Sequence, residues 1–197
     1  MAKLIYGMMM SLDGYIEDAR GSFGWAAPDE RVHSYINELD SSVGTFLYGR
    51  RMYETMVYWE TADAIPDQPP FIRDWARHWK SAEKIVYSRT LAAPRSARTR
   101  IERAFDGEAV RRLKAESPHD ITVSGPELAS EAIRLGLVDE FLMMVCPAIV
   151  GGGKRFFPVG VELNLDLMEE RRFDNGVVVL RYTRSLGDKT QTRSLSS

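Results

Sequence analysis

Residues 45–54 have the sequence TFLYGRRMYE, in which an apolar stretch gives way to a glycine and two arginines. The apolar part, residues 45–48, predicts a short buried strand, and the apolar spacing over 51–59 predicts a helix. Gly49 lies at the turn between them and lets a ligand approach the backbone. In open α/β sheets, ligands bind where strands end, since the first N–H groups of the next helix favour anions. With two guanidinium groups as further donors, this turn predicts a phosphate site.

Two other strand ends share this character. Residues 121–128, ITVSGPEL, predict a strand, a tight glycine turn and the start of a helix. Residues 84–89, KIVYSR, predict a strand that ends with a hydroxyl and a guanidinium, a pair suited to the 2′-phosphate of an adenosine ribose. Each element alone is common, and the Walker and G-x-G-x-x-G patterns are absent from the sequence. Three such elements in one chain, each at the carboxyl end of a strand, favour a phosphorylated nucleotide as the ligand.

The rest of the chain alternates between strand and helix patterns. Nearly continuous apolar residues at 4–10 and 140–149 predict buried strands, and helical spacing predicts helices over 29–39, 71–80 and 107–116. This alternation predicts an α/β protein with a mostly parallel sheet and helices on both faces, in three αβα layers. The remaining expected elements are a strand over 98–104, a helix over 127–135, and strands over 164–172 and 177–183 joined by a hairpin turn at 174–176.

Composition limits the domain organisation and the classes of partner. The chain of 197 residues is 44% apolar and 27% charged, which suits a globular protein. Residues 1–186 are expected to form one domain, and the polar residues 187–197 a disordered tail. The net charge of −2 gives no general attraction to nucleic acid or to an anionic membrane. No apolar stretch is long enough to span a bilayer and no signal-peptide pattern is present, so a cytoplasmic location is expected.

The cysteine and histidine content gives no indication of a metal site. The single cysteine, Cys146, excludes a disulfide within the chain and a cysteine-rich zinc site. His33, His78 and His119 show no pairing typical of metal ligands, and each is expected at the surface. The chain is therefore expected to bind no metal.

The chain contains, in this order, SLDGYI at 11–16, GRRMYE at 49–54, KIVYSRTL at 84–91, SGPELA at 124–129, VDE at 138–140, GGG at 151–153 and FFP at 156–158. This succession resembles the dihydrofolate reductase-like superfamily. More specifically, residues 3–184 are similar to the reductase (C-terminal) domain of the bifunctional riboflavin-biosynthesis deaminase-reductase and to its stand-alone bacterial relatives. The deaminase half would contain a zinc signature with several cysteines, so a stand-alone reductase-type domain is expected.

The resemblance implies a mixed central sheet of about eight strands with a C-terminal antiparallel hairpin, NADPH as the hydride donor, and a homodimer. It also implies that Met9 meets the nicotinamide amide through its backbone. The cofactor phosphates would face Gly49, Arg50, Arg51 and Met52. The adenosine 2′-phosphate would meet Ser88 and Arg89, and Tyr87 before them belongs to the same cofactor site. The pyrophosphate would lie against Gly125, Pro126, Glu127 and Leu128. Pro126 removes one N–H donor from its turn, and Glu127 adds a negative charge near the phosphates.

Two positions are candidates for the catalytic acid. Folate reduction in the superfamily uses an acid on the first helix, where this chain has Glu30, or Asp29 with a shift of one residue. Asp13 lies in the Ser-Leu-Asp-Gly turn that would border the substrate cleft. Both candidates have a structural alternative, because acids in a first helical turn complement the helix dipole and Asp-Gly is a common turn pair. Lys154 and Arg155 are either contacts for a ribose phosphate or solvated loop charges.

Together these features predict an NADPH-dependent reductase that transfers a hydride to a small heterocyclic or imine-like substrate. The resemblance implies a substrate of the riboflavin-precursor pyrimidine or pterin type, as for a 5-amino-6-(5-phosphoribosylamino)uracil reductase. The alternative is a non-catalytic nucleotide-binding or regulatory dimer module, which the absence of an unambiguous acid favours. A purely structural dimer module is a third alternative, because apolar strands near the C-terminus could pair with a second subunit.

Overall fold

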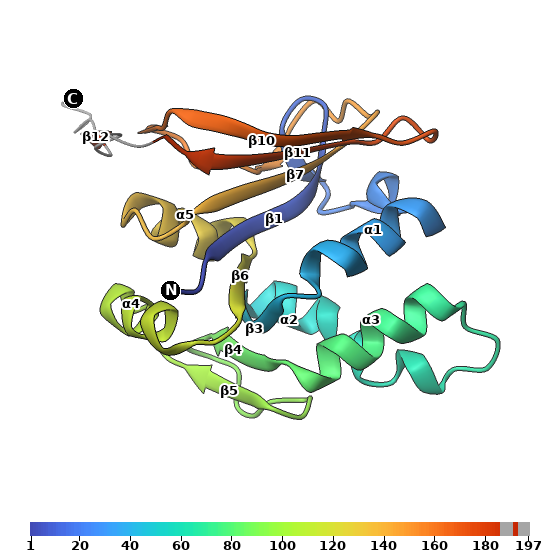
Figure 1. Ribbon diagram of the computed structural model, residues 1–197, viewed down its shortest axis with the longest axis horizontal. Helices are drawn as coiled ribbons and strands as arrows, with labels where there is room; N and C mark the ends of the chain where they lie inside the picture. The colour runs from blue at the N-terminus through green and yellow to red at the C-terminus, as the bar shows by residue number, and fades with distance from the viewer. Residues whose placement is uncertain (186–190, 193–197) are drawn as a thin grey trace.

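The computed structural model describes residues 1–185 and 191–192 and has one large mixed β-sheet at its centre (Figure 1). The strand order is β10-β11-β7-β1-β6-β3-β4-β5, and pairing is parallel from β7 to β5. β11 pairs antiparallel with β7 and with β10. The strands are β1 (Leu4–Ser11), β3 (Val43–Gly49), β4 (Glu83–Tyr87), β5 (Thr99–Glu102), β6 (Asp120–Ser124), β7 (Glu140–Cys146), β10 (Leu165–Arg172) and β11 (Val178–Arg184).

Helices cover both faces of this sheet (Figure 1), so the predicted three-layer α/β fold with a C-terminal antiparallel hairpin is confirmed. One face packs against α1 (Glu30–Asp40), α2 (Arg50–Met56) and α3 (Pro70–Ser81), and the other against α4 (Gly107–Glu116) and α5 (Pro126–Arg134). No helix in the described part of the chain is long and apolar enough to cross a membrane. The connections contain η1 (Gly24–Ala26), η2 (Val57–Glu60) and η3 (Ala62–Ala64), and the short strand pairs β2 (Tyr15–Asp18) with β8 (Gly153–Arg155) and β9 (Val161–Glu162) with β12 (Gln191–Thr192).

Local sequence explains where the main helices begin. The Asp29 carboxylate accepts a hydrogen bond from the Val32 N–H at 2.9 Å and caps α1. Pro70 and Pro126 occupy the first positions of α3 and α5, where the missing N–H of proline has no intrahelical partner to lose.

The structure differs from the sequence predictions where tertiary pairing or a single residue outweighs the local pattern. Strand β7 ends at Cys146 rather than at residue 149, because Pro147 has no N–H to continue the ladder. Helix α2 ends at Met56 and passes into 3-10 turns, whereas a helix through residue 59 was expected. Most of the predicted disordered tail, 187–197, lies outside the described residues, and its residues 191–192 form β12.

The face beneath α1, α2 and α3 holds two separate apolar clusters. One joins α1 to β1 and β7, and the other joins α2 and α3 to β3 and β4. Ile36 on α1 touches both clusters. Gly7, which has no side chain, and Thr122, whose side chain is small, lie on β1 and β6 and line the cavity described below.

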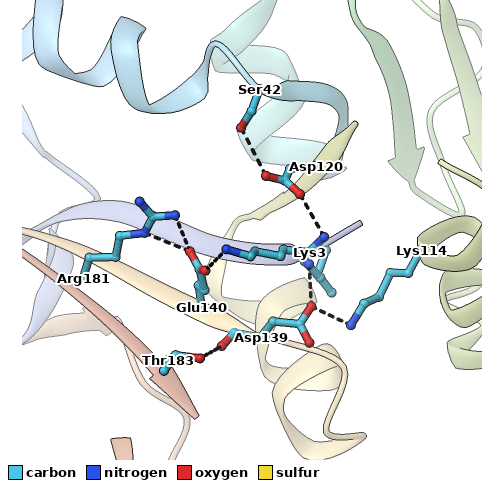
Figure 2. A network of polar contacts seen from close by, with 9 residues as sticks. Lys3, Ser42, Lys114, Asp120, Asp139, Glu140, Arg181 and Thr183 are labelled. Carbon is cyan, nitrogen blue, oxygen red and sulfur yellow. Dashed lines mark hydrogen bonds and ion pairs between the residues drawn. The ribbon is translucent and has the colours of Figure 1, made fainter. Parts of the chain in front are cut away.

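Charged groups join the strands at the edge where the parallel strands begin (Figure 2). Glu140 is only 4% exposed, and its carboxylate lies 2.6 Å from the Lys3 Nζ and 2.7 Å from an Arg181 guanidinium nitrogen. The neighbouring Asp139 accepts hydrogen bonds from the Leu4 N–H at 2.7 Å and forms an ion pair with the Lys114 Nζ at 2.6 Å. These contacts connect β1, β7, β11 and α4 at the edge where the parallel strands begin, opposite the edge formed by their carboxyl ends.

Candidate functional site

The three predicted phosphate elements lie side by side at the carboxyl ends of neighbouring strands. β3 pairs in parallel with β4 and β6, so that Gly49 pairs with Tyr87 and Tyr48 with Ser124. A Cβ placed on Gly125 would lie 3.6 Å from the Met52 Cβ and 3.8 Å from the Gly49 nitrogen. The turns after β3 and β6 are therefore in contact, and the Ser88-Arg89 strand end adjoins them.

A cavity of about 1010 Å³ opens at this edge, at the upper end of the roughly 300–1,000 Å³ range of small-molecule sites. It continues over the face of the sheet between α1 and the α2–α3 cluster. All twelve residues that the sequence predicted for cofactor binding line it: Met9, Gly49, Arg50, Arg51, Met52, Tyr87, Ser88, Arg89, Gly125, Pro126, Glu127 and Leu128.

The two turn glycines serve different purposes. Gly125 has a φ of 98° and lies in the left-handed region that side-chain-bearing residues rarely adopt. Gly49 has an ordinary φ of −70°, and a Cβ there would meet nothing within 4 Å. The backbone therefore requires glycine at position 125, whereas at position 49 glycine leaves free volume beside the cavity.

Arginine side chains surround the mouth of the cavity. Arg50 is held in place by Glu54, at 2.9 Å, and by the Thr90 hydroxyl, at 2.6 Å. Within the described residues, the exposed guanidinium groups of Arg51 and Arg89 make no hydrogen bond or ion pair. Two cationic groups next to the glycine turns are therefore available to an anionic ligand.

Ser88 and Arg103 form a second polar unit beside Arg89. The Ser88 hydroxyl accepts hydrogen bonds from the Leu91 N–H at 3.0 Å and the Thr90 N–H at 3.3 Å, which leaves its own proton to donate. The Arg103 guanidinium donates to the backbone carbonyls of Ser88 and Leu91, at 3.0 and 2.8 Å. Arg103 lines the cavity but was not among the predicted site residues, because the strand before it has only a weak sequence pattern.

The turn before α5 offers backbone N–H donors, and the negative charge of Glu127 beside them is offset by a lysine. Gly125 caps the helix without a side-chain hydrogen bond, and the first helical bond runs from the Ala129 N–H to the Gly125 carbonyl at 2.9 Å. The Glu127 carboxylate lies 3.2 Å from the Lys154 Nζ, which lies 3.3 Å from Glu17 as well. Lys154 therefore offsets the charge that Glu127 adds near the expected phosphates.

The two predicted catalytic acids do not line this cavity. Asp13 accepts hydrogen bonds from the Val150 N–H at 3.2 Å and the Gly151 N–H at 2.8 Å. Hydrogen bonds from Ser11 and from these backbone groups hold the pKa of the Asp13 carboxyl below its usual range. Glu30 is exposed in the first turn of α1. Asp13 thus holds the loop at residues 150–151, and Glu30 lies near the N-terminus of α1, where an acid complements the helix dipole.

The inner part of the cavity contains polar residues that sequence reasoning missed. His33, expected at the surface, is only 7% exposed, and burial lowers the pKa of its imidazole. Thr122 is equally buried, and Asp40 has its pKa raised to about 7 by burial. We call the space bounded by His33, Asp40, Phe46, Trp59, Trp75 and Thr122 the inner chamber. The helical spacing of 33, 36 and 40 was the signal available in the sequence.

In the described part of the chain, no group of three or more His, Cys, Asp or Glu side chains could hold a metal ion. Lys154 and Arg155, which the sequence left as either ribose phosphate contacts or solvated loop charges, lie in different places. The Arg155 guanidinium lies 5.3 Å from the centre of the Tyr15 ring and does not line the cavity, whereas Lys154 does. The arrangement therefore suits an organic anion at the mouth and a less polar group inside.

Solved structures show the same fold in proteins linked to riboflavin synthesis. A candidate riboflavin biosynthesis protein from Shewanella sp. PV-4 superposes with a TM-score of 0.72 at 20% identity, covering 94% of this chain and 99% of its own. The Thermotoga maritima diaminohydroxyphosphoribosylaminopyrimidine deaminase/5-amino-6-(5-phosphoribosylamino)uracil reductase gives a TM-score of 0.65 at 15% identity, covering 93% of this chain and 57% of its own.

Sequence comparison is more specific than these structural similarities. The chain is 31% identical over 187 residues to the uncharacterized protein YyaP of Bacillus subtilis (strain 168), covering 91% of this chain and 94% of that protein. Residues 2–179 match the family model of the RibD C-terminal domain. The protein thus belongs to the RibD C-terminal domain family, a family of reductase domains.

Proposed function

We propose that this protein is an NADPH-dependent reductase that transfers a hydride to a small heterocyclic or imine-like acceptor of the pyrimidine or pterin type. The observation that carries the proposal is the single cavity in which all twelve residues expected to bind the cofactor come together. Membership of a family of reductase domains supports the same reaction class. The Thermotoga relative, whose name includes a uracil reductase, supports a pyrimidine-type acceptor.

The residues around Arg89 fit the 2′-phosphate that distinguishes NADPH from NADH. The Arg89 guanidinium is exposed at the cavity mouth, and the adjacent Ser88 hydroxyl has a proton to donate. Arg103 adds a third donor group beside them. Tyr87 and Phe105, whose ring centroids are 5.3 Å apart, provide an aromatic wall next to this unit for the adenine.

The contacting glycine turns fit the pyrophosphate. Arg51 is unpaired in the described part of the chain, and the Glu127 and Leu128 amides lie in the first turn of α5, where N–H groups and the helix dipole attract anions. The clearance at Gly49 allows a phosphate to approach the backbone.

Bound NADPH would supply a hydride, and the remaining requirements fall to the chain itself. The backbone of β1 at Met9 would orient the nicotinamide amide, next to Met144 on the paired strand. The apolar side chains Leu142, Met144 and Ile36 line the cavity on the α1 side and make that wall unfavourable for water. Positioning of donor and acceptor in a dry site is the main contribution that a reductase makes to hydride transfer.

The experiment that tests this proposal is a calorimetric titration of the protein with NADPH and with NADH. We expect tighter binding of NADPH, and we expect Arg89→Ala to weaken NADPH by about tenfold to a hundredfold, the range for a charge-assisted hydrogen bond. Binding of NADH should change little. Arg112→Ala, on α4 and outside the cavity, is the matched control. No binding of either nucleotide, or equal losses for both with Arg89→Ala, would contradict the proposal.

A non-catalytic nucleotide-binding module is the second candidate, and one observation favours it. Asp13 and Glu30, the predicted acids, lie outside the cavity. The two functions differ in one measurement, the absorbance of NADPH in the presence of a pterin or pyrimidine acceptor. A decrease in absorbance that depends on the protein excludes the non-catalytic module.

A further inference from the structure

The inner chamber differs in character from the mouth of the cavity. The lysines and arginines that the structure places in the cavity wall lie around its mouth: Arg50, Arg51, Arg89 and Arg103 follow β3, β4 and β5, and Lys154 on β8 pairs with Glu127 in the first turn of α5. The chamber walls are aromatic or carry a hydroxyl, an imidazole or a carboxyl. A phosphate in the chamber would lack a cationic partner.

The chamber follows α1 from the strand ends toward the edge where the strands begin. His33, Ile36 and Asp40 form one stripe of this helix and all line the cavity. His33 and Asp40 are seven residues apart, about 10 Å along the helix axis. Thr122 lies opposite the stripe, on β6. A ligand in the chamber can therefore be contacted by polar groups at its edges.

Two of these polar groups are buried and lack a partner. The Thr122 Oγ1 and the His33 Nδ1 make no hydrogen bond to any described residue, although both atoms are buried and each residue is only 7% exposed. Buried polar atoms in folded proteins are almost always hydrogen-bonded, so both atoms indicate a ligand or ordered water in this space. Asp40 adds a carboxyl whose pKa burial raises to about 7, so that it can accept or donate.

Aromatic rings enclose the same space. The Trp59 and Trp75 ring centroids are 6.1 Å apart with the planes at 80°, and His33 lies 5.7 Å from Trp59 and 6.3 Å from Trp75. Phe46 on the sheet lies 6.0 Å from Trp75. Such walls offer flat apolar surfaces to a planar ring.

We propose that the inner chamber binds the ring of the hydride acceptor as an uncharged, planar nitrogen heterocycle without a phosphate group, with Thr122, His33 and Asp40 as its polar contacts. This inference rests on the proposed reductase function and names the substrate class of that site. The ring would place its N–H and carbonyl or amino groups against the three side chains and its faces against the tryptophans. The cations at the mouth would serve the nucleotide and not the acceptor.

The test is a titration of the protein saturated with NADP⁺, followed by quenching of tryptophan fluorescence and by calorimetry. The probes are pterin, 5,6-diaminouracil and, as the phosphate probe, ribose 5-phosphate. We expect a bare heterocycle to bind and to quench the fluorescence, and ribose 5-phosphate to bind far more weakly. Binding of ribose 5-phosphate without binding of either heterocycle, or no binding of any probe, would overturn the proposal.

Two variants assign the contacts. Thr122→Val keeps the shape of the side chain and removes its hydroxyl, and Asp40→Asn removes the charge, so each should weaken heterocycle binding by about tenfold. Thr45→Val is the matched control, because Thr45 is equally buried on the neighbouring strand and does not line the cavity. Unchanged heterocycle binding in both chamber variants would refute the assignment.

NADPH binding separates this inference from the proposed function. Both chamber variants should bind NADPH as the unmodified protein does. A protein that binds the heterocycle but no nucleotide would overturn the reductase proposal, whereas the assignment of the chamber as a heterocycle site would stand. A protein that binds NADPH but no heterocycle would overturn the chamber assignment, whereas the proposed nucleotide site would stand.

Discussion

Lys154 joins two parts of the chain that are far apart in sequence, because its Nζ lies 3.2 Å from the Glu127 carboxylate in the first turn of α5. The same Nζ lies 3.3 Å from Glu17 on β2, so one cation stands between two anions beside the expected pyrophosphate site. The balance of charge at this turn therefore depends on a residue from β8.

Removal of this cation should weaken nucleotide binding. Lys154→Met leaves Glu127 and Glu17 uncompensated, and we expect NADPH and NADH to lose affinity by a similar factor of about three to tenfold, since both carry the pyrophosphate. Glu127→Gln should strengthen both. Calorimetry measures the two dissociation constants, and Arg155→Met is the neighbouring control outside the cavity. An unequal effect on the two nucleotides would speak against a pyrophosphate role.

Alanine substitutions at the two turn glycines should have different effects, one on the free energy of unfolding and the other on NADPH binding. Gly125→Ala forces a side chain into the left-handed region and should lower the free energy of unfolding by about 1–3 kcal/mol. Gly49→Ala meets no atom within 4 Å and should leave stability within about 0.5 kcal/mol while it weakens NADPH binding. Urea unfolding and nucleotide titration of both variants check this contrast. A Gly49→Ala variant with unaltered NADPH affinity would show that no phosphate approaches this backbone.

The buried carboxylate at the opposite edge should matter for stability alone. Glu140→Gln removes the negative charge that Lys3 and Arg181 share, and we expect the free energy of unfolding to fall by about 1–3 kcal/mol. The comparison variant is Glu116→Gln at the exposed end of α4, which should have little effect. Nucleotide affinity should be unchanged in both variants, and a loss of affinity with Glu140→Gln would mean that the two edges are coupled.

Lys84 should make stability rise with pH in the alkaline range. Its Nζ is fully buried and donates to the Trp79 carbonyl at 2.9 Å at the end of α3, and burial lowers the pKa of the ammonium from 10.5 to about 8. Between these values the unfolded chain holds a proton that the folded chain has lost, so the free energy of unfolding increases with pH by at most about 1.4 kcal/mol per pH unit. Below pH 8 both states are protonated and the contribution is constant.

The measurement is the difference in unfolding free energy between the unmodified protein and Lys84→Met at several pH values from 7 to 10. We expect this difference to shift in favour of the unmodified protein above about pH 8. A difference that is independent of pH would mean that Lys84 keeps its proton throughout.

We propose that the homodimer implied by the sequence resemblance forms through the edge strand β10. Leu167 and Met168 are 49% and 61% exposed on this strand, whose outer edge has no neighbour in the eight-stranded sheet of the described residues. Apolar side chains on an unpaired edge favour association with a second copy. Light scattering should give twice the chain mass, and Met168→Glu should shift the protein toward the monomer. A monomer in the unmodified protein at high concentration would exclude the homodimer.

The strand ends were predictable from sequence because their signals are local. Gly49, Gly125 and the Ser88-Arg89 pair each follow an apolar strand within a few residues, and the fold brings them together because parallel strands end at one edge. The short strand β2 gave no such signal, since its pairing with β8 depends on residues distant in sequence.

The inner chamber was not predictable in the same way. His33, Asp40 and Thr122 come from α1 and β6, and only tertiary packing makes them neighbours of one space. The sequence placed His33 at the surface because the helical spacing of 33, 36 and 40 shows only that these residues share one face of a helix, and not that this face is buried. Asp13 and Glu30 were chosen by their place in a motif. In the structure the Asp13 carboxylate accepts hydrogen bonds from a loop, Glu30 is exposed in the first turn of α1, and neither residue lines the cavity.

The ion pairs at the beginning of the strands and the chamber near α1 have no residue in common. A library of variants confined to positions 33, 40 and 122 would therefore leave the buried charges of the scaffold untouched. Such variants would change the groups that face an acceptor and leave these ion pairs in place. Under the proposed function, this division makes the protein a suitable starting point for the directed evolution of altered acceptor preference.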